Sequence, residues 1–271
     1  MTPPNPSSSI AIFDSGLGGL TVMRAIEQLL PNEKIIYFGD TARLPYGNKT
    51  PETILRYSLE NAAYLSSYDI KTLVIACNTS CSAGAIANIQ ALYNIPVVGI
   101  TTVAIEEICE RLPKGKLALL ATRATINSQI YQHELRSRCP ELEIISIPCP
   151  LFVPLVEEGY IEHALSTIAV RDYLHPLAGQ GIDAALLGCT HYPLLQSLIQ
   201  QELGSHVQII DPSYACAEKI RTLLTERNWL NPATQPPQHQ FIVSEDPSKF
   251  SSLSKLFLSR PIDAVLPHTF H

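Results

Sequence analysis

The stretch that decides the fold is TLVIACNT, residues 72–79, in which an apolar run is followed by a cysteine and two small polar residues. A second stretch, AALLGCTH at residues 184–191, has the same build. Short apolar runs that lead into helical patterns are typical of buried strands in parallel sheets. The two stretches therefore predict two turns from strand to helix, with Cys77 at the first and Cys189 at the second.

The same alternation of apolar runs and helical patterns continues along the chain and predicts an α/β fold with mainly parallel sheets flanked by helices. A strand expected at residues 10–13 is followed by Asp14, 63 residues before Cys77. A strand expected at residues 116–121 is followed by Thr122, 67 residues before Cys189. Two similar, pseudo-twofold domains with a cleft between them would produce this echo. Chance resemblance between strands would also produce it, so the echo alone leaves both explanations open.

The chain has a plausible crossing between two such halves near residues 99–102. We expect a first domain of residues 9–100 plus 212–271 and a second domain of residues 101–211. In open parallel sheets, ligands bind beyond the carboxyl ends of the strands, where loops meet helix N-termini. The predicted site is therefore the interdomain cleft at these strand ends.

Composition argues against several classes of partner. The chain has 271 residues, 46% of them hydrophobic and 16% charged, with a net charge of −6. Such a chain gains little from a nucleic-acid backbone or an anionic membrane, and no apolar run approaches the roughly 20 residues that span a bilayer. Residues 1–9 lack an export signal and are expected to be a short disordered lead-in. We therefore expect a cytoplasmic protein that acts on a small molecule.

The seven cysteines are an odd number in a long chain without an export signal. Reduced thiols are therefore expected, and a disulfide framework is not. Four of them have no polar cluster beside them and are interpreted as structural: Cys109, Cys139, Cys149 and Cys216. Helix N-termini lower the pKa of a nearby thiol, so cysteines at strand-to-helix turns are the better candidates for chemistry.

Two further polar stretches follow the first two expected strands. The turn DSGLGG, residues 14–19, offers backbone N–H groups to an anion, but it is neither a dinucleotide fingerprint nor a phosphate-binding loop. Asp14 would repel a phosphate, so a ligand with an ammonium group and carboxylates fits better. The stretch DTARLPYG, residues 40–47, is either a rigid turn or a fixed loop in which Tyr46 and Gly47 present hydrogen-bond donors.

A pair of opposed thiols suits one reaction in particular. Inverting a carbon stereocentre needs a base on one face to remove a proton and an acid on the other face to return one. Cys77 and Cys189 could fill these roles by exchanging thiol and thiolate forms in each turnover. Asp14 is the candidate partner for Cys77, while His191 and Glu157 are the candidates for the second site.

Other interpretations of these cysteines remain open at this point. Cys77, Cys81, Cys189 and His191 could form a four-ligand zinc site, although their spacing is unlike a usual zinc knuckle. Cys77 with His191 could act as a nucleophile for acyl transfer, which leaves Cys189 unexplained. A protein that binds an amino acid without catalysis could also keep the same fold.

The sequence resembles the glutamate racemases, within the wider aspartate/glutamate racemase superfamily, over nearly its whole length. The resemblance is carried by DSGLGGLTV at residues 14–22, PYG at 45–47, ACNT at 76–79, PLVE at 154–157 and GCTHYPLL at 188–195. It implies two α/β domains with the site between them, and neither pyridoxal phosphate nor a metal. It also implies the production of D-glutamate for bacterial peptidoglycan, by a protein that is commonly a homodimer.

The resemblance assigns roles to particular residues. It implies that Cys77 acts on D-glutamate and Cys189 on L-glutamate. Auxiliary acid/base positions fall on Asp14, Glu157 and His191. The implied substrate contacts are Asp14, Ser15, Tyr46, Gly47, Asn78, Thr79, Thr190 and His191.

The sequence departs from the family pattern at three places. Cys81 adds a third thiol near the first cysteine, DPS at residues 211–213 replaces a more usual Asp-Ser, and SE at residues 244–245 stands where Thr-Gly is common. These changes leave the cysteine pair intact. Aspartate racemisation by the same chemistry, in a shorter side-chain pocket, is the close alternative, and the full glutamate-type motifs favour glutamate.

Overall fold

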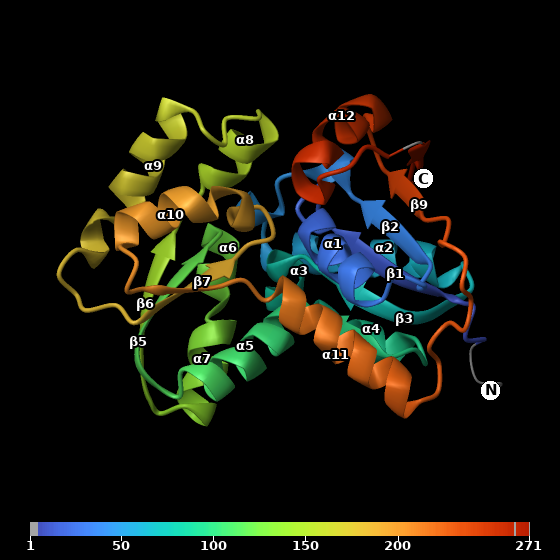
Figure 1. Ribbon diagram of the computed structural model, residues 1–271, viewed down its shortest axis with the longest axis horizontal. Helices are drawn as coiled ribbons and strands as arrows, with labels where there is room; N and C mark the ends of the chain where they lie inside the picture. Colours follow the sequence, from blue (N-terminus) through green and yellow to red (C-terminus); the bar gives the residue numbers. More distant parts are fainter. Residues whose placement is uncertain (1–4, 263, 271) are drawn as a thin grey trace.

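The computed structural model describes residues 5–262 and 264–270, which form two parallel β-sheets flanked by helices (Figure 1). The first sheet contains β1 (Ser9–Asp14), β2 (Ile35–Gly39), β3 (Ile70–Ile75), β4 (Val97–Gly99), β9 (Gln240–Val243) and β10 (Leu266–Pro267). The second contains β5 (Lys114–Ala121), β6 (Glu141–Pro148), β7 (Ala184–Gly188) and β8 (Gln208–Ile210). Their strand pairs are parallel, so the predicted α/β fold class is confirmed.

Helices follow most strands. Those of the first part of the chain are α1 (Leu20–Leu29), α2 (Pro51–Ser66), α3 (Asn78–Ser82), α4 (Ala85–Leu92) and α5 (Ile100–Arg111). Next come α6 (Arg123–Ser128), α7 (Ile130–Arg138), α8 (Phe152–Glu157), α9 (Ala164–Leu174), α10 (Gln196–Leu203), α11 (Ser213–Glu226) and α12 (Pro247–Leu258). Within the residues described, none of these helices combines the length and the apolar character needed to cross a membrane.

The two sheets share one strand order. The first runs β10-β9-β2-β1-β3-β4 and the second runs β6-β5-β7-β8. In both, the first strand in the chain lies between the second and the third, and the fourth lies outside the third. Cys77 comes two residues after β3, and Cys189 directly follows β7, which is the third strand of its sheet. The echo in the sequence therefore corresponds to equivalent places in the two sheets, and the first sheet differs by the added strands β9 and β10.

Burial on both faces explains why the strands are continuous apolar runs. Every residue of β1 and of β3 is buried. In β5, Ala118 and Leu120 join the larger hydrophobic core, whereas Leu117 and Leu119 face a smaller core with α5 and α7. This alternation, with period two, places helices on both sides of the second sheet.

The chain crosses between the sheets twice. It leaves the first sheet after β4 and enters α5, and it returns after β8 through α11. Helices α5 and α11 pack against each other along the lower side of the molecule in Figure 1. We propose that the domains divide at these crossings, as residues 9–100 plus 212–271 and residues 101–211.

The expected disordered lead-in is wrong for residues 5–9. Ser8 and Ser9 are buried, and Ser9 begins β1. The buried Lys71 ammonium donates a hydrogen bond to the carbonyl of Pro6 at 2.6 Å, and Ser8 donates one to Asp69 at 2.7 Å. These partners lie far along the chain, which is why local composition did not reveal them. Residues 1–4 of the lead-in lie outside the described part of the chain.

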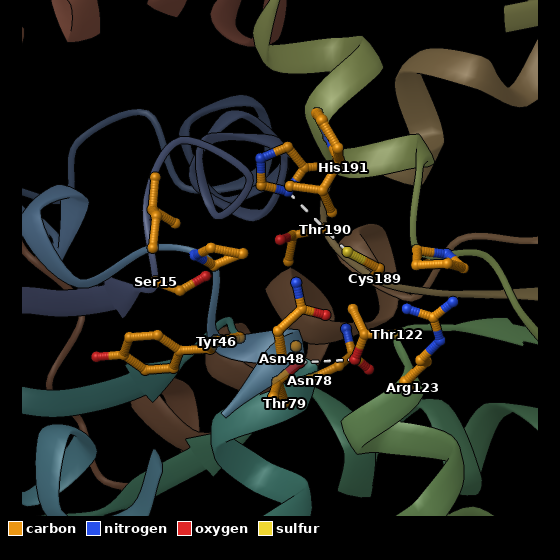
Figure 2. Close-up of a pocket in the computed structure, with 17 residues that line it drawn as sticks. Ser15, Tyr46, Asn48, Asn78, Thr79, Thr122, Arg123, Cys189, Thr190 and His191 are labelled. Atoms are coloured by element: carbon orange, nitrogen blue, oxygen red, sulfur yellow. Dashed lines mark hydrogen bonds between the residues drawn. The ribbon is translucent and has the colours of Figure 1, made fainter. Parts of the chain in front are cut away.

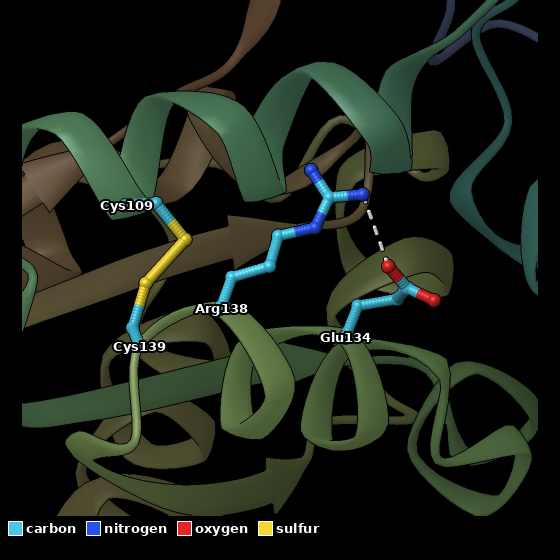
Figure 3. The surroundings of a disulfide bond; sticks show 4 residues. All are labelled: Cys109, Glu134, Arg138 and Cys139. Atoms are coloured by element: carbon cyan, nitrogen blue, oxygen red, sulfur yellow. Dashed lines mark hydrogen bonds and ion pairs between the residues drawn. A yellow bond between two sulfur atoms is a disulfide. The ribbon is translucent and has the colours of Figure 1, made fainter.

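The expectation that all seven thiols are free is also wrong. Cys109 of α5 and Cys139, which follows α7, form a disulfide with Cα atoms 6.1 Å apart (Figure 3). The two helices pack together, and this brings cysteines 30 residues apart in sequence into contact. The remaining five cysteines are free and buried.

Candidate active site

A cavity of about 600 Å³, including its opening to solvent, lies where the carboxyl ends of the two sheets meet (Figure 2). Nine of the predicted site residues line it: Ser15, Tyr46, Gly47, Cys77, Asn78, Thr79, Cys189, Thr190 and His191. The other two, Asp14 and Glu157, stand behind this lining and are hydrogen-bonded to Thr190 and to His191, respectively. The structure therefore brings the predicted residues together at one place.

Asp14 lies at the end of β1 and is fully buried. Its carboxylate accepts hydrogen bonds from the backbone N–H of Gly16 at 3.0 Å and from the Thr190 hydroxyl at 3.2 Å. Burial raises the pKa of Asp14, because a carboxylate loses its hydration there, and the nearby His191 partly opposes this. Asp14 thus links the first sheet to the loop that carries the second cysteine.

The glycines after Asp14 permit this contact between the halves. A Cβ on Gly18 would collide with the side chains of Thr190 and His191, and a Cβ on Gly19 would lie 2.6 Å from the Cβ of Asp14. Real side chains do not tolerate such distances, so glycine is needed for the close approach. The Gly-rich turn that the sequence singled out is therefore a contact between the two halves of the site.

Cys77 caps the short helix α3 and is almost completely buried. Its sulfur accepts a hydrogen bond from the backbone N–H of Ser80 at 3.5 Å. Burial, followed by the charge of Asp14, raises the pKa of Cys77 to about 12. The thiol form is therefore the stable form of Cys77 at neutral pH.

Cys189 has different neighbours. Its sulfur lies 4.0 Å from Nδ1 of His191, and Nε2 of the same ring lies 3.0 Å from a Glu157 oxygen. Burial disfavours the imidazolium, but the hydrogen bonds to Cys189 and Glu157 outweigh it and raise the pKa of His191 to about 10. A protonated His191 therefore stands beside the second thiol at neutral pH.

Asn78 and Thr79 connect α3 to the second half of the molecule. The buried Tyr131 hydroxyl donates to the side-chain oxygen of Asn78 at 2.6 Å, and the hydroxyls of Thr79 and Thr122 lie 3.0 Å apart. Gly47 approaches Thr122 so closely that a Cβ there would lie 2.9 Å from the Cβ of Thr122. These contacts fix the polar floor of the cavity across the boundary between the halves.

The hydroxyl of Tyr46 does not face the cavity, although the sequence left it open as a hydrogen-bond donor to a ligand. Its ring is buried, and its hydroxyl points away from Thr79 and Cys189 in Figure 2. That hydroxyl donates to Asp40 and accepts from the Asn61 amide at 3.1 Å. Only the backbone around Tyr46 and Gly47 is therefore left to meet a ligand.

Sequence reasoning missed three polar residues that line the cavity, namely Asn48, Thr122 and Arg123. The echo between the halves contained a signal for Thr122, because it placed this residue opposite Asp14 as the end of an equivalent strand. Arg123 begins α6, and Figure 2 shows its side chain on the same side of the cavity as Cys189. Its guanidinium has no ion-pair partner among the residues described.

The described residues offer no set of ligands for the zinc site that the sequence left open. Across residues 5–262 and 264–270, no group of three or more His, Cys, Asp or Glu side chains is arranged to hold a metal ion. Cys81 donates a hydrogen bond to the carbonyl of Ile75 at 3.5 Å, and it does not line the cavity.

Comparison with known proteins now identifies the family. A profile described as Asp/Glu/Hydantoin racemase matches residues 10–220, which include both cysteines and every residue of the cavity. The chain belongs to the Asp/Glu/Hydantoin racemase family. The predicted resemblance is confirmed by relatives named glutamate racemase, for example that of Geobacter metallireducens, with 42% identity over 96% of both chains. The prediction of an amino-acid racemase is confirmed with it.

Solved racemase structures have the same architecture. Glutamate racemase from Francisella tularensis in complex with D-glutamate matches with a TM-score of 0.91 and 35% identity, over 97% of this chain and 98% of that one. An aspartate racemase homologue from Pyrococcus horikoshii matches with a TM-score of 0.55 and 19% identity, over 80% of this chain and 99% of that one. The second likeness is one of fold alone.

Proposed function

We propose that this racemase interconverts L- and D-glutamate, with Cys77 and Cys189 as its two acid/base groups and without a cofactor. The observation that carries the proposal is that the two thiols come from equivalent strand ends of two sheets and line a single cavity. Relatives named glutamate racemase over almost the whole chain support glutamate as the substrate.

The proposed reaction moves one proton in each half-step. A thiolate on one side takes the Cα proton, and the electron pair left on Cα delocalises into the adjacent carboxylate. The thiol on the other side then delivers its proton to the opposite face of Cα. The two sulfurs end with their protonation states exchanged, and the substrate gains and loses one proton in total.

The neighbours of the two cysteines support unequal resting states. The raised pKa of Cys77, about 12, keeps this thiol protonated. A protonated His191, held by Glu157, lies 4.0 Å from the Cys189 sulfur, where its positive charge would stabilise a negative charge on that sulfur. The resting enzyme is then ready to take the Cα proton of L-glutamate with Cys189, while Asp14 disfavours a second negative charge on Cys77 until the substrate is bound.

Polar groups around the cavity suit an amino acid with two carboxylates. The Ser15 hydroxyl, the Asn78 amide and the backbone N–H groups of Tyr46 and Gly47 can donate hydrogen bonds. The hydroxyl oxygens of Thr79 and Thr190 can accept them from the substrate ammonium group. Arg123 supplies a permanent positive charge for the side-chain carboxylate. We propose these residues as the substrate-binding set, with Asp14, Glu157 and His191 in auxiliary acid/base roles.

The experiment that tests this function is isotope exchange in deuterated water. Wild-type protein incubated with L-glutamate should form D-glutamate that carries deuterium at Cα, and aspartate run in parallel should react far more slowly. Cys77→Ser and Cys189→Ser should each lower racemisation by ~10²–10⁴-fold, the range contributed by a positioned acid or base.

Cys216→Ser is the matched control, since Cys216 is a free, buried thiol in α11 that does not line the cavity. This variant should keep most of its activity. Absence of exchange in wild-type protein, or full exchange in both active-site serine variants, would contradict the proposed function. Faster reaction of aspartate would instead identify an aspartate racemase.

We extend the proposal to the cell. D-glutamate formed in this way would supply bacterial peptidoglycan synthesis from the cytoplasm, by a protein that acts as a homodimer. Growth of a strain without the gene should then depend on added D-glutamate, and sedimentation of the pure protein should give twice the chain mass.

A further inference from the structure

The loop between β2 and α2 carries Tyr46, Gly47 and Asn48 to the cavity, and its support lies outside the site described above. The loop consists of two short 3₁₀ turns, at Thr41–Arg43 and Tyr46–Asn48. Such turns have few hydrogen bonds of their own, so side chains from elsewhere must fix the loop.

Asp40 is the centre of that support. Its side chain is fully buried, and one oxygen accepts from both the Tyr46 hydroxyl and Nε of Arg43, the latter at 2.7 Å. The other oxygen accepts from the hydroxyl of Ser244 at 2.9 Å, just after β9. The buried carboxylate thus joins the first turn, the second turn and the added strand β9.

Arg43 is held on several sides. Its guanidinium pairs with Glu60 of α2 and donates to the Asn61 side chain at 2.8 Å. The rings of Tyr57 and Phe270 lie with centroids 4.2 and 4.0 Å from its central carbon. Contacts of this kind favour a fixed guanidinium, because a desolvated cation gains from an aromatic face.

Phe270 belongs to a segment, residues 266–270, that continues the added edge of the first sheet. Leu266 and Pro267 form β10 beside β9, and the backbone N–H of His268 donates to the carbonyl of Val243 at 2.8 Å. The His268 ring stacks on Tyr64 of α2, with centroids 3.6 Å apart. The segment is therefore docked on α2 and β9, with Phe270 directed at Arg43.

We propose that residues 266–270 act as a positioning element of the active site, in which Phe270 orders the substrate loop through Arg43 and Asp40. None of these three side chains lines the cavity. They act on the backbone at Tyr46 and Gly47, which the proposed function uses to bind substrate. The kinetic part of this inference rests on that function, whereas its structural part does not.

The test compares Phe270→Ala with two other variants. The alanine variant should raise KM for glutamate ~5-fold or more, equivalent to about 1 kcal/mol, with kcat within twofold of wild type. Phe270→Tyr, which keeps the aromatic face against Arg43, should have the same KM as the wild-type protein. Val265→Ala is the matched control: it truncates a partly buried side chain beside the segment, which packs on the core and not on Arg43.

Hydrogen exchange of the backbone amides of residues 41–50 gives a readout that needs no activity. Phe270→Ala should accelerate exchange in this loop, and Val265→Ala should leave it at the wild-type rate. Unchanged exchange and KM in Phe270→Ala, or equal effects in both alanine variants, would overturn the inference. Faster exchange of this loop in Phe270→Ala, combined with no racemisation by the wild-type protein, would support the positioning element and reject the proposed function.

Discussion

The two cysteines occupy equivalent places in two sheets of the same strand order, yet their surroundings differ in charge. Cys77 has the buried carboxyl of Asp14 nearby, and its pKa is raised to about 12. Cys189 has His191, whose own pKa is raised to about 10 and which is held by Glu157. Equivalent backbone positions thus carry opposite charges beside the sulfur. The proposed mechanism, in which one sulfur is a thiol while the other is a thiolate, would benefit from this asymmetry.

The largest expected effect comes from removing the positive partner of Cys189. His191→Asn should lower kcat/KM by ~10²-fold or more, because the thiolate loses its charged neighbour. The two enantiomers have equal free energies in solution, so kcat/KM must fall equally in both directions. Circular dichroism of glutamate followed from each enantiomer measures this, and unchanged rates would refute the assigned role.

A second test compares the two thiols directly. Both are more than nine-tenths buried, so access to a small alkylating reagent is similar. At pH 7.5, iodoacetamide should modify Cys189 ~10-fold or more faster than Cys77, since only the thiolate reacts. Asp14→Asn should narrow this gap by removing a charge that raises the pKa of Cys77. Peptide mass spectrometry gives both rates of modification. Faster modification of Cys77 than of Cys189 would contradict the proposed resting state.

The pH dependence of stability probes the same asymmetry without substrate. The folded-state pKa of His191 lies above its ordinary value of 6.5, so its contribution to the free energy of unfolding is fully present below about pH 6.5. That contribution is lost as the pH rises towards 10, by on the order of 2 kcal/mol or more. Urea unfolding of wild type and His191→Asn should converge over this window, and parallel curves would contradict it.

The smallest expected effect concerns the ends of the first strands of the two sheets. In the first sheet, β1 ends with Asp14. In the second sheet, β5 is followed by Thr122 and Arg123. Arg123→Ala should raise KM for glutamate ~3-fold to 10-fold, as expected for a partly exposed charge-assisted hydrogen bond, with little change in kcat. Arg123→Lys should give an intermediate KM. A KM equal to that of wild type in both variants would remove Arg123 from the binding set.

The local features were predictable from sequence. Apolar runs gave both sheets, because parallel strands are buried on both faces, and the two cysteine turns were placed correctly. The short strands β8 and β10 were not predicted, since neither contains an apolar run of more than two residues. Two helices, α3 and α4, follow Cys77, and they are separated at Gly84, whose φ of 86° lies in the left-handed region.

Contacts between distant segments could not be predicted from the sequence. The disulfide between Cys109 and Cys139 depends on how α5 packs on α7, and cysteine spacing does not encode this. The direction of the Tyr46 hydroxyl depends on Asp40 and Asn61, which a motif alone does not rank as partners. The place of Arg123 in the cavity was missed because one exposed arginine has no local signature.

The added edge of the first sheet has a consequence for how the protein is made. β2 pairs with β9, and Ile36 meets Gln240, although the whole second sheet lies between them in the chain. A ribosome delivers the chain in order, and contacts between distant segments form late in folding. The edge of β2 therefore waits unpaired until synthesis has passed the second sheet. The support that we propose Phe270 gives to residues 40–48 also forms only then, because Phe270 lies at the far end of the chain.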